Sequence, residues 1–210
     1  MLWAALAVNA AMFLVEVVAG AGAGSSALHA DALDFFADAA NYAISLFVLG
    51  AALRTRATAA LLKGLSMGGF GLWVVGRALY HAVTGGVPAG EVMGAVGLVA
   101  LLANVGVALL LYRYRTGDSN MRSVWLCSRN DAVGNVAVAL AGGAVLLTGR
   151  GWPDAVVALG MAALALSGAR QIVGQALAER RGADSSPAAA GDGVIAAGRL
   201  DTPAGERARW

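Results

Sequence analysis

Long apolar stretches dominate this chain, and short polar or glycine-rich segments separate them. Six of the stretches approach the length of about 20 residues that a helix needs to cross a bilayer. The pattern predicts helices at about 2–22, 27–53, 60–84, 90–114, 121–148 and 153–178. The segments between them carry typical turn residues, such as Gly85-Gly86-Val87-Pro88. We therefore expect an all-α integral membrane protein, built as a bundle of six transmembrane helices.

The two ends of the chain need separate interpretations. The first apolar segment lacks a preceding basic region and is too long for a secretory signal, so we expect it to span the membrane. Polar Asn9 and Glu16 within it should face the bundle interior. Near the other end the apolar periodicity stops. Residues 1–180 are predicted to form one transmembrane domain, and 181–210 a disordered cytoplasmic tail that is dispensable for insertion and transport.

Composition supports a membrane environment. The chain is 59% hydrophobic and only 13% charged, whereas soluble domains contain about 25% charged residues. Most of its surface is therefore expected to contact the lipid bilayer or other helices. No basic patch alternates with aromatic residues, which argues against a nucleic acid as partner. The single cysteine, Cys127, excludes an internal disulfide and a zinc motif made of cysteine pairs.

The positive charges predict the orientation. They gather after the second helix, after the fourth helix and at the end of the sixth. Because Lys and Arg are enriched in cytoplasmic loops, both chain termini are predicted to be cytoplasmic. The expected location is a plasma membrane, of the bacterial inner-membrane type. The charges are Arg54, Arg56 and Lys63; Arg113, Arg115 and Arg122; and Arg170, Arg180 and Arg181.

A polar stripe interrupts the second apolar stretch. Asp31, Asp34, Asp38 and Asn41 fall on one face of a helix with 3.6 residues per turn. Each charge at the centre of a bilayer costs about 2.5 kcal/mol or more, so three acids need a compensating partner. An amphipathic surface helix with its acids in water is the alternative, but the surrounding sequence favours a membrane span.

A second polar set lies in the fifth predicted helix. Cys127, Asp131 and Asn135 again share one helical face. At 1.5 Å per residue, Asp34 and Asp38 lie ~12 and ~18 Å from one surface, and Cys127 and Asp131 ~10 and ~16 Å from the other. Across about 30 Å of hydrocarbon, Asp131 should lie level with Asp34 and Cys127 level with Asp38. Three carboxylates and a thiolate suit a tetrahedral divalent metal such as zinc.

These two motifs resemble those of the cation diffusion facilitator (cation efflux) family. The second-helix signature of that family is similar to Ser26-Ala27-Leu28-His29-Ala30-Asp31-Ala32-Leu33-Asp34-Phe35-Phe36-Ala37-Asp38, and its usual His-x-x-x-Asp in helix 5 is similar to Cys127-x-x-x-Asp131. Further similarities are Asn9, Glu16, Asn104 and Trp152-Pro153-Asp154. The resemblance covers about residues 2–180. It implies a homodimeric antiporter that exports divalent metal ions, usually zinc, often in exchange for protons, with Asp34, Asp38, Cys127 and Asp131 as ligands.

The chain also departs from the family pattern. Residues 181–210 stand where the family usually has a folded cytoplasmic domain, so dimerisation would rest on the membrane part. A short Thr116-Gly117-Asp118-Ser119-Asn120 segment replaces a histidine-rich loop. Cys127 replaces the common histidine, which favours softer ions and leaves cadmium and cobalt open beside zinc. The metal ion is expected as cargo, and no resident cofactor is expected.

Other polar residues have two interpretations each. Asp31 is either a further ligand or an acceptor behind the ligands, and Asn41 and Asn135 continue the two polar stripes. Arg129 would be a counter-ion for the acids or would reach to the cytoplasmic surface. His29 lies near the outer end of the second helix, either as a step on the metal pathway or as an interfacial histidine.

Two other functions compete with transport. Some membrane-embedded phosphotransferases hold metal ions with clustered aspartates, but this chain lacks their Asp-Gly pattern and a suitably placed arginine. A non-transporting membrane subunit, whose acids only join helices, is the other alternative. Metal uptake into vesicles would separate both from a secondary transporter.

Overall fold

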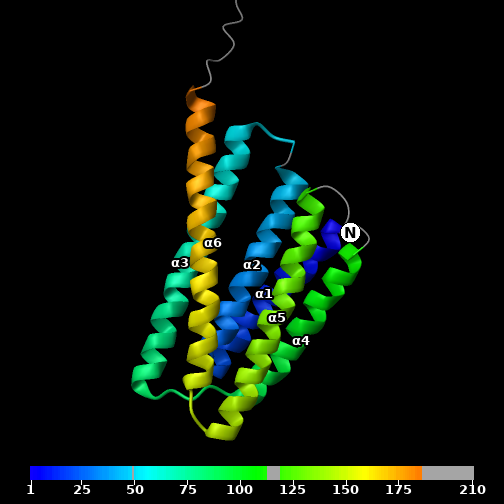
Figure 1. The fold of residues 1–210 in the computed structure, drawn as a ribbon. Helices are drawn as coiled ribbons and strands as arrows, with labels where there is room; N and C mark the ends of the chain where they lie inside the picture. The colour runs from blue at the N-terminus through cyan, green and yellow to red at the C-terminus, as the bar shows by residue number, and fades with distance from the viewer. Residues whose placement is uncertain (49, 113–118, 186–210) are drawn as a thin grey trace, which may run out of the picture.

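A computed structural model describes residues 1–48, 50–112 and 119–185, and for 119–130 and 183–185 it describes the backbone alone. This part of the chain contains six helices and no strand, which confirms the predicted number and order of helices (Figure 1). The helices are α1 (Leu2–Ala23), α2 (Ser26–Phe47), α3 (Leu53–Thr84), α4 (Gly90–Leu111), α5 (Ser119–Thr148) and α6 (Trp152–Ser185).

Five of the six helices are long and apolar enough to cross a membrane, namely α1, α3, α4, α6 and the Asp131–Thr148 part of α5. The exception is α2, whose 22 residues include three aspartates and a histidine. These five spans indicate an integral membrane protein. The polar helix α2 must then be sheltered from lipid by its neighbours.

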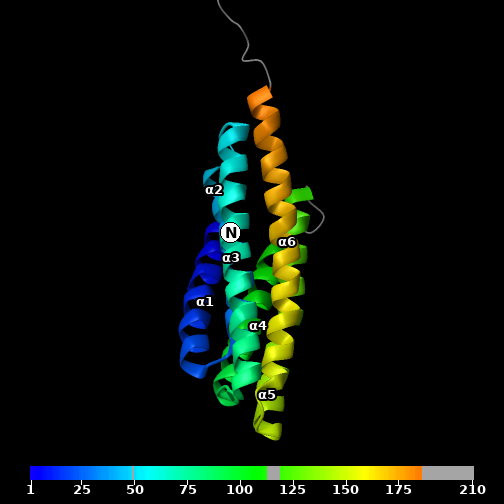
Figure 2. The same ribbon diagram turned by 90° about the vertical axis from the view of Figure 1, so that its left-hand side faces the viewer.

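The packing provides that shelter. In the described part of the chain, α2 contacts all five other helices, and no other helix does so. The most extensive pairs around it are α3 with α6, α4 with α5, and α1 with α2 (Figures 1 and 2). The helix that carries the acidic stripe is therefore the centre of the bundle.

Successive helices run in opposite directions along the bundle. Consequently the N-terminus and the far end of α6 lie at the same end, and the α3–α4 and α5–α6 connections lie at the opposite end (Figure 1). This arrangement is consistent with both termini on one side of a membrane. Their location in the cytoplasm remains a prediction.

One predicted boundary is wrong. The second helix was expected to continue to residue 53 and to be followed by a polar loop containing Arg54 and Arg56. Instead α2 ends at Phe47, and α3 begins at Leu53, so that both arginines lie in its first turn. Neither glycine nor proline follows Gly50 until Gly64, so nothing stops the helix from starting early. Thr58 also donates from Oγ1 to the carbonyl of Arg54 at 2.8 Å.

The last helix is longer than predicted. It reaches Ser185 rather than residue 178, so the first part of the expected tail is helical. Residues 186–210 lie outside the described residues, and the disordered tail stays a prediction there. Together α3 and α6, with 32 and 34 residues, extend past their neighbours at the end that carries the N-terminus (Figure 1).

Glycines allow α4 and α5 to approach closely. A Cβ atom built on Gly142 would lie 2.8 Å from both the carbonyl oxygen of Gly90 and the amide nitrogen of Gly94. A Cβ on Gly97 would lie 3.1 Å from the amide nitrogen of Ala139. Small residues let helix backbones meet in this way within membranes. This tight α4–α5 contact fixes the position of α5 beside α2.

Candidate metal-binding site

The acidic stripe of α2 faces the interior of the bundle. Asp31 is completely buried, Asp38 is only 5% exposed, and Asp34 keeps partial accessibility. The stripe continues to Asn41, whose side chain also lies on the inner part of the helix near α3. An amphipathic surface helix with its acids in water is therefore excluded for α2.

Helix α5 brings a third carboxylate to the same place. The carboxyl groups of Asp38 and Asp131 lie within hydrogen-bonding range of each other, and Asp34 is their next acidic neighbour. The two helices contact each other directly. Thus three of the four predicted ligands, from segments about 90 residues apart in the sequence, are gathered in one interior cluster.

The depth estimate placed Asp131 level with Asp34. In the structure Asp131 has both Asp38 and Asp34 of α2 as acidic neighbours, and Asp38 acts on it more strongly. The relative levels of the four predicted ligands in the membrane stay a prediction.

The fourth predicted ligand, Cys127, lies on α5 one helical turn before Asp131. Its side chain, like that of Arg129, falls outside the described residues, so their roles stay predictions. Among the side chains that are described, no three from His, Cys, Asp or Glu converge closely enough to hold a metal ion. The described portion of the site is a cluster of carboxylates, and not a closed coordination shell.

Comparison with known families identifies the chain at this point. Residues 2–179 match the model of the cation efflux transmembrane domain. The chain belongs to the cation efflux family. The match runs from the start of α1 into α6, and this family consists of metal cation transporters, so the resemblance inferred from the two motifs is confirmed. A search of curated proteins finds no match.

The burial of one cation beside the carboxylate cluster was not anticipated. Lys63, which was counted with the positive charges after the second helix, lies in α3 with only 9% of its surface exposed. Its Nζ donates to Oδ1 of Asn41, and its charge acts on Asp38. The sequence contained a signal, because Lys63 stands ten residues after the start of α3, between two mainly apolar stretches of that helix. A buried ammonium group needs polar partners, and the acidic stripe supplies them.

A second buried polar group borders the carboxylate cluster. Glu16 of α1 lies fully buried beside Asp31, which confirms that Glu16 faces inward. Asn9, Asn104 and Asn135 are also buried. In the described part of the chain, no donor reaches the carboxylate oxygens of Glu16 and Asp31, and Asn135 makes no side-chain hydrogen bond. The bundle interior thus contains buried polar side chains in addition to the four predicted ligands.

His29 makes the contacts of a packing residue. Its Nδ1 lies 2.7 Å from the carbonyl oxygen of Ser25, to which it donates. The imidazole packs edge-on against Trp73, with 4.8 Å between ring centroids. A Cβ on Gly20 would lie 2.9 Å from the same ring, so α1 also closes over it. These contacts account for His29 without a step on the metal pathway.

Asp154 holds the first turn of α2. Its Oδ1 accepts hydrogen bonds from Oγ of Ser25 and the amide of Ala27, and its Oδ2 accepts one from the amide of Ser26. Ser25 in turn accepts from the amide of Leu28. A helix begins with amides that lack partners, and a carboxylate there is also favoured by the helix dipole. Helix α6 therefore anchors the end of the helix that carries Asp34 and Asp38.

Proposed function

We propose that this cation efflux protein exports a divalent metal ion, zinc in the first place, with Asp34, Asp38, Cys127 and Asp131 as the ligands. The observation that carries the proposal is the approach of Asp38 and Asp131 from two helices inside the bundle. Carboxylates and a thiolate form the kind of set that tetrahedral zinc accepts. The Cys127 thiolate would also admit cadmium.

Proton exchange follows from the same cluster. Two ionised carboxylates in hydrogen-bonding range repel each other, and either a shared proton or a bound cation removes that repulsion. A divalent ion that enters would displace such protons, because metal ligands must be deprotonated. Protons and metal would then compete for one site. This competition couples their movements without a separate proton pathway.

The remaining parts of the proposal concern the assembly and its setting. Homodimers, cytoplasmic termini and a bacterial-type inner membrane agree with the family resemblance and with the arginine distribution. Export requires the metal to leave through the end of the bundle that carries the α3–α4 and α5–α6 connections. The proposal therefore assigns that end to the outside.

The test is transport by the purified protein in liposomes with an imposed pH gradient. Wild-type protein should move zinc in one direction and protons in the other. Metal-sensitive and pH-sensitive dyes inside the liposomes report the two fluxes. Asp38→Asn and Asp131→Asn should abolish zinc movement while the protein remains inserted. Glu91→Gln is the matched control, because Glu91 is an exposed acid in the first turn of α4.

Three results would contradict the proposal. Undiminished transport by Asp131→Asn would remove α5 from the site. Zinc movement without proton movement would remove the exchange mechanism while leaving transport intact. The absence of any divalent metal movement by inserted wild-type protein would favour the non-transporting membrane subunit.

A further inference from the structure

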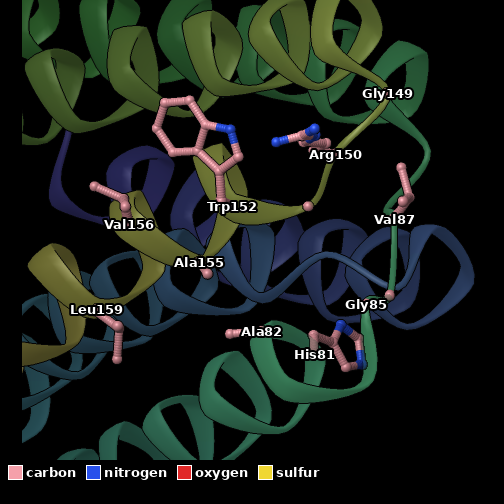
Figure 3. Close-up of a pocket in the computed structure, with 12 residues that line it drawn as sticks. His81, Ala82, Gly85, Val87, Gly149, Arg150, Trp152, Ala155, Val156 and Leu159 are labelled. Atoms are coloured by element: carbon pink, nitrogen blue, oxygen red, sulfur yellow. The ribbon is translucent and has the colours of Figure 1, made fainter.

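A cavity of about 560 Å³ opens at the end of the bundle opposite the N-terminus. One wall comes from the end of α3 and the α3–α4 connection, and the other from the α5–α6 connection and the start of α6 (Figure 3). The two connections touch at its base, where a Cβ on Gly151 would collide with the carbonyl oxygen of Gly86. This cavity is remote from the carboxylate cluster and is not used by the proposed transport chemistry.

The polar side chains that line the cavity are those of Arg150, His81 and Trp152. The guanidinium of Arg150 extends along the same wall as Trp152, and His81 lies on the opposite wall (Figure 3). Nδ1 of His81 is buried and has no hydrogen-bond partner within the described structure. None of the lining residues carries a carboxylate. Both carboxylate oxygens of the nearby acid Asp154 accept hydrogen bonds from Ser25, Ser26 and Ala27 at the start of α2.

The rest of the cavity is apolar and faces outward. Trp152 and Val156 are 56% and 60% exposed, and Leu159 continues the wall along α6. Helix α6 is one of the membrane spans and begins at Trp152, so the cavity lies where that span leaves the hydrocarbon. Tryptophan is enriched at this level of a membrane. The cavity thus combines a cationic rim with an apolar wall that leads into the bilayer.

We propose that this cavity binds one anionic phospholipid. The headgroup phosphate would lie on Arg150, with the His81 imidazole as a second donor, and an acyl chain would follow Val156 and Leu159. A free phosphate would match the rim but not the apolar wall, and an uncharged lipid would match only the wall. An amphiphile with a phosphate at the membrane surface matches both. Arginine suits this ligand because its guanidinium binds phosphate oxygens in pairs.

The test measures lipid binding to the full chain purified in a neutral detergent. The probes are phosphatidylglycerol, diacylglycerol without phosphate, and inorganic phosphate, and native mass spectrometry counts the bound molecules. Wild-type protein should retain one phosphatidylglycerol in preference to the other two probes. Brominated acyl chains should quench the fluorescence of Trp152. Comparison with Trp152→Phe shows which part of the quenched fluorescence comes from Trp152.

Two variants examine the rim and the volume separately. Arg150→Gln should weaken phosphatidylglycerol binding about tenfold, as expected for loss of a charge-assisted hydrogen bond. Ala82→Trp keeps Arg150 and His81 but fills the cavity from the α3 side, and should also displace the lipid. Arg56→Gln is the matched control, since it removes an exposed arginine from the other end of the bundle.

Several outcomes would overturn the assignment. Equal losses in Arg150→Gln and Arg56→Gln would show only a general attraction between cations and anionic lipid. Binding of inorganic phosphate as tight as that of phosphatidylglycerol would assign the rim to a soluble anion. If Ala82→Trp changed the oligomeric state but not lipid retention, the cavity would be a contact between two copies of the chain.

Discussion

Oγ of Ser25 donates to Oδ1 of Asp154 at 2.6 Å, and this bond joins the start of α2 to the start of α6 across 129 positions of sequence. The same carboxylate accepts two α2 amides. One side chain of α6 therefore determines where α2 begins. The acidic stripe of α2 follows about two turns later, so its position depends on this bond.

The first prediction concerns Asp154. Asp154→Ala leaves two buried amides and the Ser25 hydroxyl without their acceptor. Each such loss typically costs about 1–3 kcal/mol, so we expect a clear drop in the melting temperature of the detergent-purified protein. Zinc affinity should fall as well, because the stripe on α2 loses its anchor. Glu91→Gln serves as control, and unchanged stability of Asp154→Ala would show that water replaces the carboxylate without loss.

Lys63 provides a second prediction. Its buried ammonium group acts on Asp38 and repels a divalent cation at the same carboxylate. Lys63→Met should therefore tighten zinc binding, by about three- to tenfold on the scale of such charge interactions. Release of zinc, and hence turnover, should slow. Calorimetric titration of zinc and single-turnover flux measure the two effects.

Lys63→Arg is the matched control, because it keeps the positive charge at nearly the same place. Its zinc affinity should stay close to that of the wild type. Weaker zinc binding by Lys63→Met would mean that Lys63 holds Asn41 and Asp38 in position for the metal, and that this role outweighs repulsion.

The third prediction concerns the choice of metal. Cys127→His should restore the ligand usual in the family and retain zinc transport, but cadmium transport should decline because imidazole is a harder ligand than thiolate. Cys127→Ser should weaken transport of both ions strongly. Competitive uptake of zinc and cadmium by liposomes gives the ratio directly. If Cys127→Ala matched the wild type for both ions, the fourth ligand would lie elsewhere, with Asp31 and Asn135 as the next candidates.

The fourth prediction concerns the α4–α5 contact. Gly142→Ala places a methyl group 2.8 Å from two backbone atoms of α4 and should destabilise the protein by about 1–3 kcal/mol. Gly143→Ala makes the same change at the neighbouring position, where nothing lies within 4 Å. The control should be neutral or slightly more stable, since alanine favours helix. Equal melting temperatures of the two variants would show that α4 and α5 move apart at Gly142 at little cost in stability.

The fifth prediction concerns orientation. In a Cys127→Ser background, a cysteine at Gly50 lies in the α2–α3 connection, and one at Val87 lies in the α3–α4 connection at the other end. A membrane-impermeant maleimide added to intact cells should label Val87→Cys alone. Both positions should react after lysis. Labelling of Gly50→Cys in intact cells would reverse the proposed direction of transport.

Local sequence patterns predicted much of the fold because bilayer thickness constrains helix length. Runs of apolar residues predicted six helices in the observed order, and the 3.6-residue period placed Asp31 and Asp38 on the buried face of α2. Glu16 was interpreted correctly for the same reason, since an acid within an apolar span must turn away from lipid. These inferences require only residues that are near one another in the chain.

Contacts between helices that are far apart in the sequence could not be predicted from local patterns. Asp154 was noticed only as part of a family-like segment, since nothing in its neighbourhood indicates that its acceptors serve Ser25 and the amides of α2. Lys63 was counted with the surface arginines because charge statistics do not distinguish an exposed lysine from a buried one. The helix boundary at Leu53 was missed because Arg54 and Arg56 are as acceptable in a solvated first helical turn as in a loop.

The central position of α2 has a consequence for biosynthesis. Its three aspartates would cost about 2.5–3.5 kcal/mol each if the helix met lipid alone, and α2 does not qualify as a span by its own composition. The neighbours that shelter it include α5 and α6, which are synthesised last. We therefore expect a nascent chain to hold α2 at the aqueous edge of the translocation channel until the later helices arrive. The three aspartates of α2 would in this way delay the final assembly of the helix bundle.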